Sequence, residues 1–163
     1  MELNSTAKPT SAQYRIVQSL VKRKILLEKA DKLLKDVQSM FENEPELLYK
    51  KIDVQNVLKH FDDSNDSDNI IKETVQSTVS GDIVFPIHFA TSLGDVEMVR
   101  FMLAEHIHLA GYKKKSLLTL NDNHDYFPID IAIENKSVDV VKLLLEHDPG
   151  PYHRMYIEGQ RNR

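Results

Sequence analysis

The chain reads FPIHFATSLGDVEMVRFML at residues 85–103 and FPIDIAIENKSVDVVKLLL at residues 127–145. Each stretch places a proline where a short helix would begin, then a turn, and then a second helix with a strong apolar face. Two copies in the same order predict stacked helix pairs, that is, an all-α solenoid. Solenoids generally offer a surface to a partner, so the pattern favours binding over chemistry.

The first helix of each copy has two positions with a clear physical role. Pro86 and Pro128 fix the backbone dihedral that the first helical turn requires. Ala90 and Ala132 are small and allow neighbouring helices to approach closely. These four residues predict two tightly packed helix pairs over residues 80–148.

The turn and the second helix are also predicted by residue type. Gly94 suits the left-handed conformation that ends a helix, a role that Asn135 or Lys136 has to fill in the other copy. Asp95 and Ser137 are good caps for the second helix.

This pattern resembles the ankyrin repeat, which carries Thr-Pro-Leu-His, a small Ala, a Gly turn and Val-Val-x-Leu-Leu-Leu. The family's Thr is replaced by Phe85 and Phe127, and its His is kept as His88 but becomes Asp130. His88 is interpreted as the structural histidine of the ankyrin-like pattern. The two prolines lie 42 residues apart, whereas an ordinary ankyrin period is about 33. About nine extra residues therefore lie between the helix pairs, within residues 106–121.

Asp53 lies 42 residues before Asp95, the same spacing as between the two prolines, and this suggests a third unit. We expect a helix over residues 45–61 that opens at Pro45, and two interpretations of it stay open. It is either a degenerate third repeat or an unrelated cap helix.

The preceding region reads as an N-terminal helical extension over residues 11–79 that caps the solenoid. Its first part predicts one long helix from Ser11 to about Phe41. One heptad line of this helix consists of Leu20, Leu27, Leu34 and Phe41, and Arg23 interrupts the neighbouring apolar line. Three interpretations are a helix packed on its own domain, a coiled-coil homodimer, which is not favoured, and a membrane-surface helix. A short helix is expected over 70–79. Residues 1–10 and 149–163 read as tails, and 62–69 as an acidic loop.

Composition limits the functional classes. The net charge of −4 argues against general nucleic-acid binding, and no apolar run is long enough for a membrane span or a signal peptide. The absence of cysteine suits a reducing compartment. We therefore expect a cytoplasmic or intracellular protein, while secretion into a host cell would not be readable from the sequence.

No metal, cofactor or catalytic site is expected. The acidic segment fits EF-hand spacing, but Ser67 stands where the sharp turn needs glycine and Asn69 where an apolar anchor is usual. The closest histidine pair, His106 and His108, is spaced two apart and does not share a helical face. Phosphate loops, nucleophile elbows and metalloprotease motifs are all missing.

The ankyrin resemblance implies a non-enzymatic protein–protein interaction module that binds a protein partner through its inner helices and inter-repeat loops. Partner-binding residues are expected at the inserted segment and the following turn: Tyr112, Lys113, Lys114, Lys115, Asp122, His124, Asp125 and Tyr126. The divergent repeats look like those of host-directed proteins of intracellular bacteria. The alternatives are a self-assembling structural protein, through the long helix, and a regulatory or docking fragment of a larger enzyme.

Overall fold

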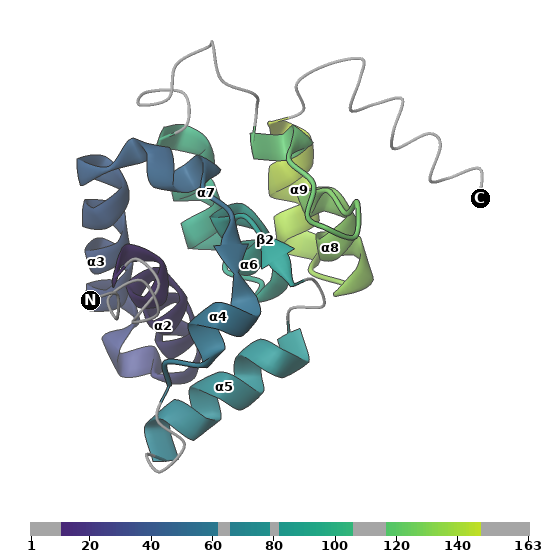
Figure 1. Ribbon diagram of the computed structural model, residues 1–163. Helices are drawn as coiled ribbons and strands as arrows, with labels where there is room; N and C mark the ends of the chain where they lie inside the picture. The colour runs from purple at the N-terminus through teal and green to yellow at the C-terminus, as the bar shows by residue number, and fades with distance from the viewer. Residues whose placement is uncertain (1–10, 62–65, 79–81, 106–116, 148–163) are drawn as a thin grey trace.

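A row of three helix pairs forms the body of the protein (Figure 1). The computed structural model describes residues 11–61, 66–78, 82–105 and 117–147. The pairs are α2 (Ser11–Ile25) with α3 (Ala30–Asn43), α6 (Pro86–Ser92) with α7 (Val96–Glu105), and α8 (Pro128–Glu134) with α9 (Val138–Glu146). Along the row, α2 packs on α6 and α3 on α7, and then α6 packs on α8 and α7 on α9. The predicted all-α helix-pair fold is therefore confirmed.

The two repeats form as the sequence predicts, with the same turn in each. Gly94 has a φ of 70° and Lys136 a φ of 58°, so lysine takes the left-handed position in the second copy. The N–H of the next residue closes both turns, donating from Asp95 to Ala90 and from Ser137 to Ala132 at 3.1 and 3.0 Å. A side-chain cap is formed by Asp95 but not by Ser137.

The predicted single helix over residues 11–41 is wrong, because the chain turns at Leu26. This residue has φ −104° and ψ 82°, and the short 3-10 helix η1 (Leu27–Lys29) leads into α3. The two halves then lie side by side and bury Ile16, Leu20 and Phe41 completely. Folding back lets both halves pack on α6 and α7, and this burial outweighs the local preference for a continuous helix. Of the heptad line, Leu20 and Phe41 belong to the protein's own core, whereas Leu27 is 76% exposed in the turn.

The helix expected over residues 45–61 also does not form as one element. Pro45 opens only the 3-10 helix η2 (Pro45–Tyr49), which packs on α3 and α6, and β1 (Ile52–Asp53) and α4 (Val54–Leu58) follow. Asp53 caps α4 by accepting from Asn56 N at 3.1 Å, as Asp95 accepts from Met98 N at 3.2 Å. The segment keeps the cap of a repeat without its helix pair, and α2 and α3 occupy the place beside α6 and α7.

Three further elements complete the described chain. β1 pairs antiparallel with β2 (Ile83–Val84), with Ile52 opposite Val84. The helix expected over 70–79 is α5 (Asp66–Thr78), which packs on α2. It begins earlier than predicted, so residues 66–69 of the predicted acidic loop are helical. The 3-10 helix η4 (Leu117–Thr119) precedes the second repeat.

Candidate functional site

The turn that leads into the second repeat is built around the carboxylate of Asp122. Its Oδ1 accepts from the backbone N–H of His124 at 2.9 Å and of Tyr126 at 3.0 Å. Asp125 takes a φ of 63°, in the left-handed region that glycine adopts most easily. Because Asp122 is only 7% exposed and its carboxylate is held by this turn, its evident role is to shape the loop.

Asn123 ties this turn to the strand that precedes the first repeat. Its Oδ1 accepts from Asp82 N and Ile83 N, both at 3.1 Å, and its own N–H donates to Ile83 O at 3.1 Å. These three hydrogen bonds fix the turn at Asn123 relative to the start of β2. We call residues 121–126 the hairpin tip.

His88 supports the hairpin tip from below. Phe85 N–H donates to its Nδ1 at 3.1 Å, so Nε2 carries the proton and donates to the carbonyls of Leu120 and Tyr126 at 3.0 and 3.1 Å. Burial lowers the pKa of His88 below its ordinary value, although the Asp122 carboxylate opposes this shift. The side chain is completely buried and neutral, which agrees with its interpretation as a structural histidine.

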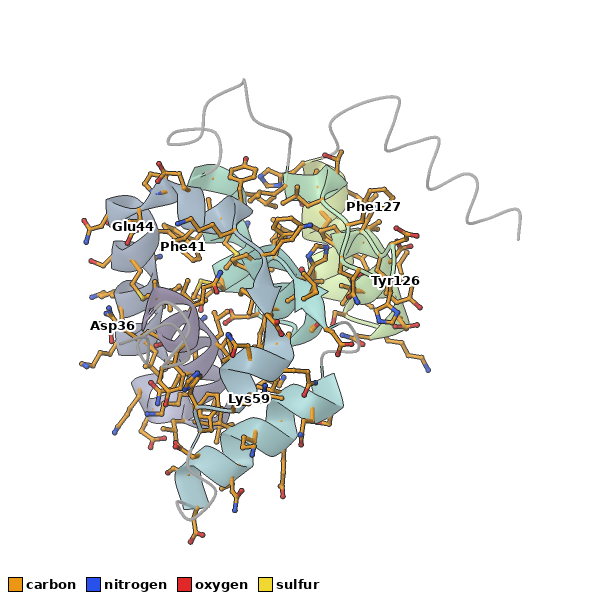
Figure 2. The ribbon with its side chains drawn as sticks, viewed as in Figure 1. Asp36, Phe41, Glu44, Lys59, Tyr126 and Phe127 are labelled. Carbon is orange, nitrogen blue, oxygen red and sulfur yellow. The ribbon has the colours of Figure 1, made fainter. Side chains whose placement is uncertain are left out.

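The predicted site residues are therefore only partly brought together. Tyr112, Lys113, Lys114 and Lys115 lie outside the described residues. His124 and Asp125 are exposed at the hairpin tip, and Tyr126 is half-buried beside Phe127 at the α8 side of the molecule (Figure 2). These three residues present a polar, preorganised surface, whereas Asp122 serves the loop itself.

The inner helices contribute less surface than the sequence suggests. Every residue of α6 from Pro86 to Thr91 is buried, because α2, η2, α7 and α8 all pack around it. In α8, by contrast, Ile133 and Glu134 are exposed. The expected binding surface on inner helices is thus limited to α8 among the described residues.

Arg23 forms a charged cluster that the sequence reasoning missed. Its Nε and Nη2 donate to the two carboxylate oxygens of Asp95 at 2.7 and 3.0 Å, and Nη2 also donates to Glu97 Oε1 at 2.6 Å. Nη1 donates to Ala30 O at 2.8 Å. The hydrogen bonds to Asp95 raise the pKa of Arg23 above its ordinary value, although burial acts in the opposite direction. The available signal was a single arginine in an otherwise apolar helical line.

This cluster joins the N-terminal cap to the first repeat. Arg23 lies at the end of α2, Ala30 begins α3, and Asp95 caps α7, so one side chain connects three elements. Nearby, Lys24 Nζ donates to Leu93 O at 3.0 Å. With Arg23 only 7% exposed, the cluster is best understood as structural.

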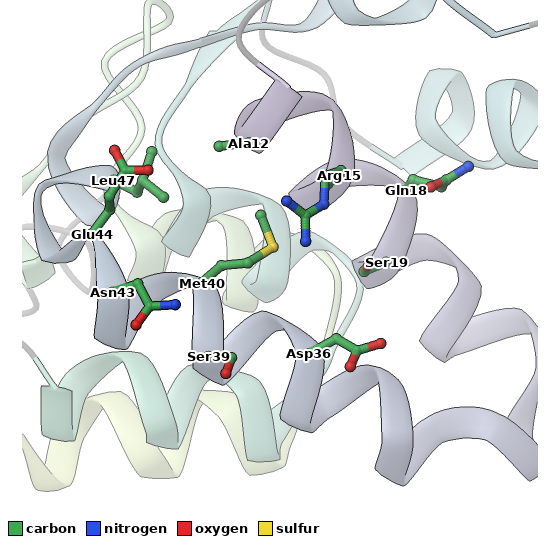
Figure 3. Close-up of a pocket in the computed structure, with 10 residues that line it drawn as sticks. All are labelled: Ala12, Arg15, Gln18, Ser19, Asp36, Ser39, Met40, Asn43, Glu44 and Leu47. Carbon is green, nitrogen blue, oxygen red and sulfur yellow. The ribbon is translucent and has the colours of Figure 1, made fainter.

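A polar cleft lies between α2 and α3 (Figure 3). It has a volume of about 400 Å³, and charged groups from both helices, Arg15 and Asp36, line it together with Glu44. The buried Met40 side chain lies at its base. Charges of both signs and an open shape give the cleft no clear preference for one ligand chemistry.

The described residues do not gather a metal site. No group of three or more histidine, aspartate or glutamate side chains is placed to hold an ion within residues 11–61, 66–78, 82–105 and 117–147. Asp66 and Asp68 of the EF-hand-like segment lie in the first turn of α5, while Asp62 and Ser64 lie outside the described part of the chain, as do His106 and His108. Over the same described ranges, no helix is long and apolar enough to cross a membrane.

A family model for ankyrin repeats in three copies matches residues 47–154. This match covers more than half of the chain, and the chain therefore belongs to the ankyrin-repeat family. It begins at residue 47 and so includes the segment whose Asp53 keeps the cap of a repeat. Searches of curated proteins and of solved structures gave no match.

Membership of this family gives the general class of function. Ankyrin repeats are generally protein–protein interaction modules, and the family is typically non-enzymatic.

Proposed function

We propose that this protein is a non-enzymatic interaction module that binds a protein partner at the hairpin tip, residues 121–126. The observation that carries the proposal is the rigid support of an exposed polar loop. His88 and Asp122 hold the loop backbone from inside, and the exposed Asn123 ties it to Asp82. His124 and Asp125 are exposed. A loop that is already ordered loses little conformational entropy when it binds.

The adjacent surface extends this site. Asp82 and Asn121 are exposed, and Asn123 bonds the backbone of Asp82 to the tip. The aspartates Asp82 and Asp125 give the surface an acidic character that favours a partner segment with basic or hydrogen-bond-donating side chains. The sequence places Tyr112 and three lysines shortly before this loop, and they stay part of the proposed site as a prediction from the sequence.

The binding experiment compares three variants with the wild type in an affinity pull-down from cell lysate, with bound proteins identified by mass spectrometry. The tip variant carries Asn121→Ala, His124→Ala and Asp125→Asn, because asparagine tolerates the positive φ. The insertion variant carries Tyr112→Ala with Lys113→Glu, Lys114→Glu and Lys115→Glu. The control variant carries Gln55→Ala in α4 and Lys59→Ala directly after it, both at exposed positions. Figure 2 shows Lys59 away from Tyr126.

A protein retained by the wild type and the control variant, but lost by the tip variant, would support the proposed site. Loss with the insertion variant alone would move the contact to residues 112–115. Equal retention by all four proteins would contradict a site on this loop. Circular dichroism has to show equal folding for each variant before the comparison is made.

The other predicted roles have less support. The coiled-coil form of self-assembly required a continuous helix over 11–41, and the structure instead buries Ile16, Leu20 and Phe41 within the chain. A host-directed role, an intracellular location and a docking role in a larger enzyme rest on the sequence resemblance and composition alone.

A further inference from the structure

A shallow groove runs along the edge of the molecule where the turns of the three helix pairs lie. One part of it, with a volume of about 440 Å³, lies between the Gly94 turn and the Lys136 turn. A second part, of about 290 Å³, lies between the Gly94 turn and the turn at Leu27 that leads into α3. Lys24, Leu93 and Gly94 line both parts, so the two form one continuous surface, which we call the turn groove.

Exposed apolar side chains mark the two ends of the turn groove. Leu27 lines one end and is 76% exposed, and Val138 lines the other end and is 61% exposed. These are the two highest exposures among the large apolar side chains in the described part of the chain. Between them, the missing side chain of Gly94 keeps the groove open beside Ser137 Oγ, which an added Cβ would meet at 3.5 Å. Two apolar anchors joined by an open groove favour a ligand with an apolar side chain at each end.

The charges of the turn groove favour an acidic ligand. The two carboxylates in the part beside Leu27 are already held by the Arg23 guanidinium in hydrogen bonds of 2.6 to 3.0 Å. In the other part, the exposed Lys24 and Lys136 outnumber the exposed Asp139. A carboxylate placed between the two lysines would therefore meet two cations and one opposing charge.

The stacking of the helix pairs sets the length of the ligand. The two ends of the turn groove lie two layers apart, from α2 and α3 past α6 and α7 to α8 and α9. Layers about 8–10 Å apart give a span of about 16–20 Å, or about five to six residues of an extended chain. We propose that the turn groove binds an extended segment of a partner protein, with two apolar side chains at about this spacing and an aspartate or glutamate between them. The groove lies at the opposite end of α8 from the hairpin tip, so it is a second interaction site.

The test selects binders to the full chain from a displayed library of random octapeptides. The library is first depleted on a groove variant with Leu27→Ser and Val138→Ser, which removes both apolar anchors at exposed positions. Circular dichroism has to show that this variant folds as the wild type does. We expect the peptides selected by the wild type to carry two apolar residues about five or six positions apart, with an acidic residue between them. No enrichment, or enrichment of basic peptides, would overturn the proposal.

The role of the lysines is measured with the most enriched peptide, labelled with fluorescein, by fluorescence anisotropy. Lys136→Glu should weaken binding by about tenfold or more, because it replaces one of the two cations by a like charge. Lys59→Glu makes the same charge change at an exposed position outside the turn groove and should leave the affinity unchanged. Equal affinities of these two variants would overturn the recognition of an acidic segment.

Two further measurements separate this site from its competitors. The tip variant, with Asn121→Ala, His124→Ala and Asp125→Asn, should bind the same peptide as tightly as the wild type, and weaker binding would overturn the proposal by placing the peptide at the hairpin tip. Light scattering tests the other occupant, a second copy of the chain, and we expect the wild type to be a monomer. A wild-type dimer that Leu27→Ser and Val138→Ser convert to a monomer would overturn the proposal and assign the turn groove to an interface between copies.

Discussion

The two repeats share a sequence pattern but differ in how fully they are enclosed. The first, α6 and α7, has a helix pair on either side, and its α6 is buried from Pro86 to Thr91. Within the part of the chain that the structure describes, the second has such a neighbour on one side, and its α8 and α9 leave Ile133, Val138 and Leu145 exposed. The comparison shows that position in the stack, more than local sequence pattern, decides how deeply each residue is buried.

The third helical residue of each repeat illustrates this difference. His88, completely buried, accepts from Phe85 N and donates to two carbonyls of the next loop. Asp130, half-buried, accepts from Phe127 N at 2.8 Å in the same way. Both side chains cap the helix, and the enclosed His88 also bonds two carbonyls of the loop that leads into the next repeat.

The largest expected effect is therefore at His88. We expect His88→Ala to lower the free energy of unfolding by about 4 kcal/mol, because it leaves a cavity and removes the side-chain partner of the buried Phe85 N and Leu120 O. Asp130→Ala should cost about 1 kcal/mol, as for the loss of one cap. Urea unfolding followed by circular dichroism measures both. Equal costs at the two positions would contradict the argument from enclosure.

The next largest effect is expected at the junction between the cap and the first repeat. Arg23→Ala should cost about 3 kcal/mol, because it leaves the poorly exposed carboxylate of Asp95 without its main partner. Arg100→Ala, at an exposed position of α7, is the matched control and should change stability by less than about 0.5 kcal/mol. The same urea experiment tests the pair, and a cost for Arg23→Ala no larger than that of the control would show that the cluster does not hold the cap.

The burial of His88 also predicts how the free energy of unfolding depends on pH. Its pKa is lowered in the folded state, so below about pH 6.5 the unfolded chain binds the proton more readily than the folded one. The contribution of His88 is therefore complete above pH 6.5 and is lost as the pH falls through the folded-state pKa. We expect His88→Asn to flatten the dependence of unfolding free energy on pH below 6.5. An unchanged slope would mean that His88 is not buried in its neutral form.

The smallest expected effect is at the turns. Gly94→Ala should cost about 1 kcal/mol through its positive φ alone, since an added Cβ would meet only Ser137 Oγ at 3.5 Å. Lys136→Gly should stabilise the second repeat by up to about 1 kcal/mol for the same reason. Thermal unfolding of the two variants measures the pair. Changes of the same sign would show that the two turns are not equivalent.

The sequence was informative where local chemistry determines the structure. Pro86 and Pro128 begin α6 and α8, and Gly94 and Lys136 take the left-handed turn positions. The ankyrin family, the two helix pairs and the structural interpretation of His88 all followed from such local signals. The partner-binding role of the site residues stays a prediction, and the sequence did not show that the Asp122 carboxylate is bonded to the backbone of its own loop.

Tertiary structure decided the features that depend on residues far apart in the chain. The break at Leu26 has neither glycine nor proline to announce it, and it forms because α2 and α3 bury more apolar surface when folded back against α6 and α7. The role of Arg23 required Asp95 to lie 72 residues away in sequence and 2.7 Å away in space. The amino-acid sequence by itself thus determined the repeated unit, through proline, alanine and turn residues. Only packing decided how that unit is capped and which of its polar groups are left for a partner, because both depend on contacts between distant segments.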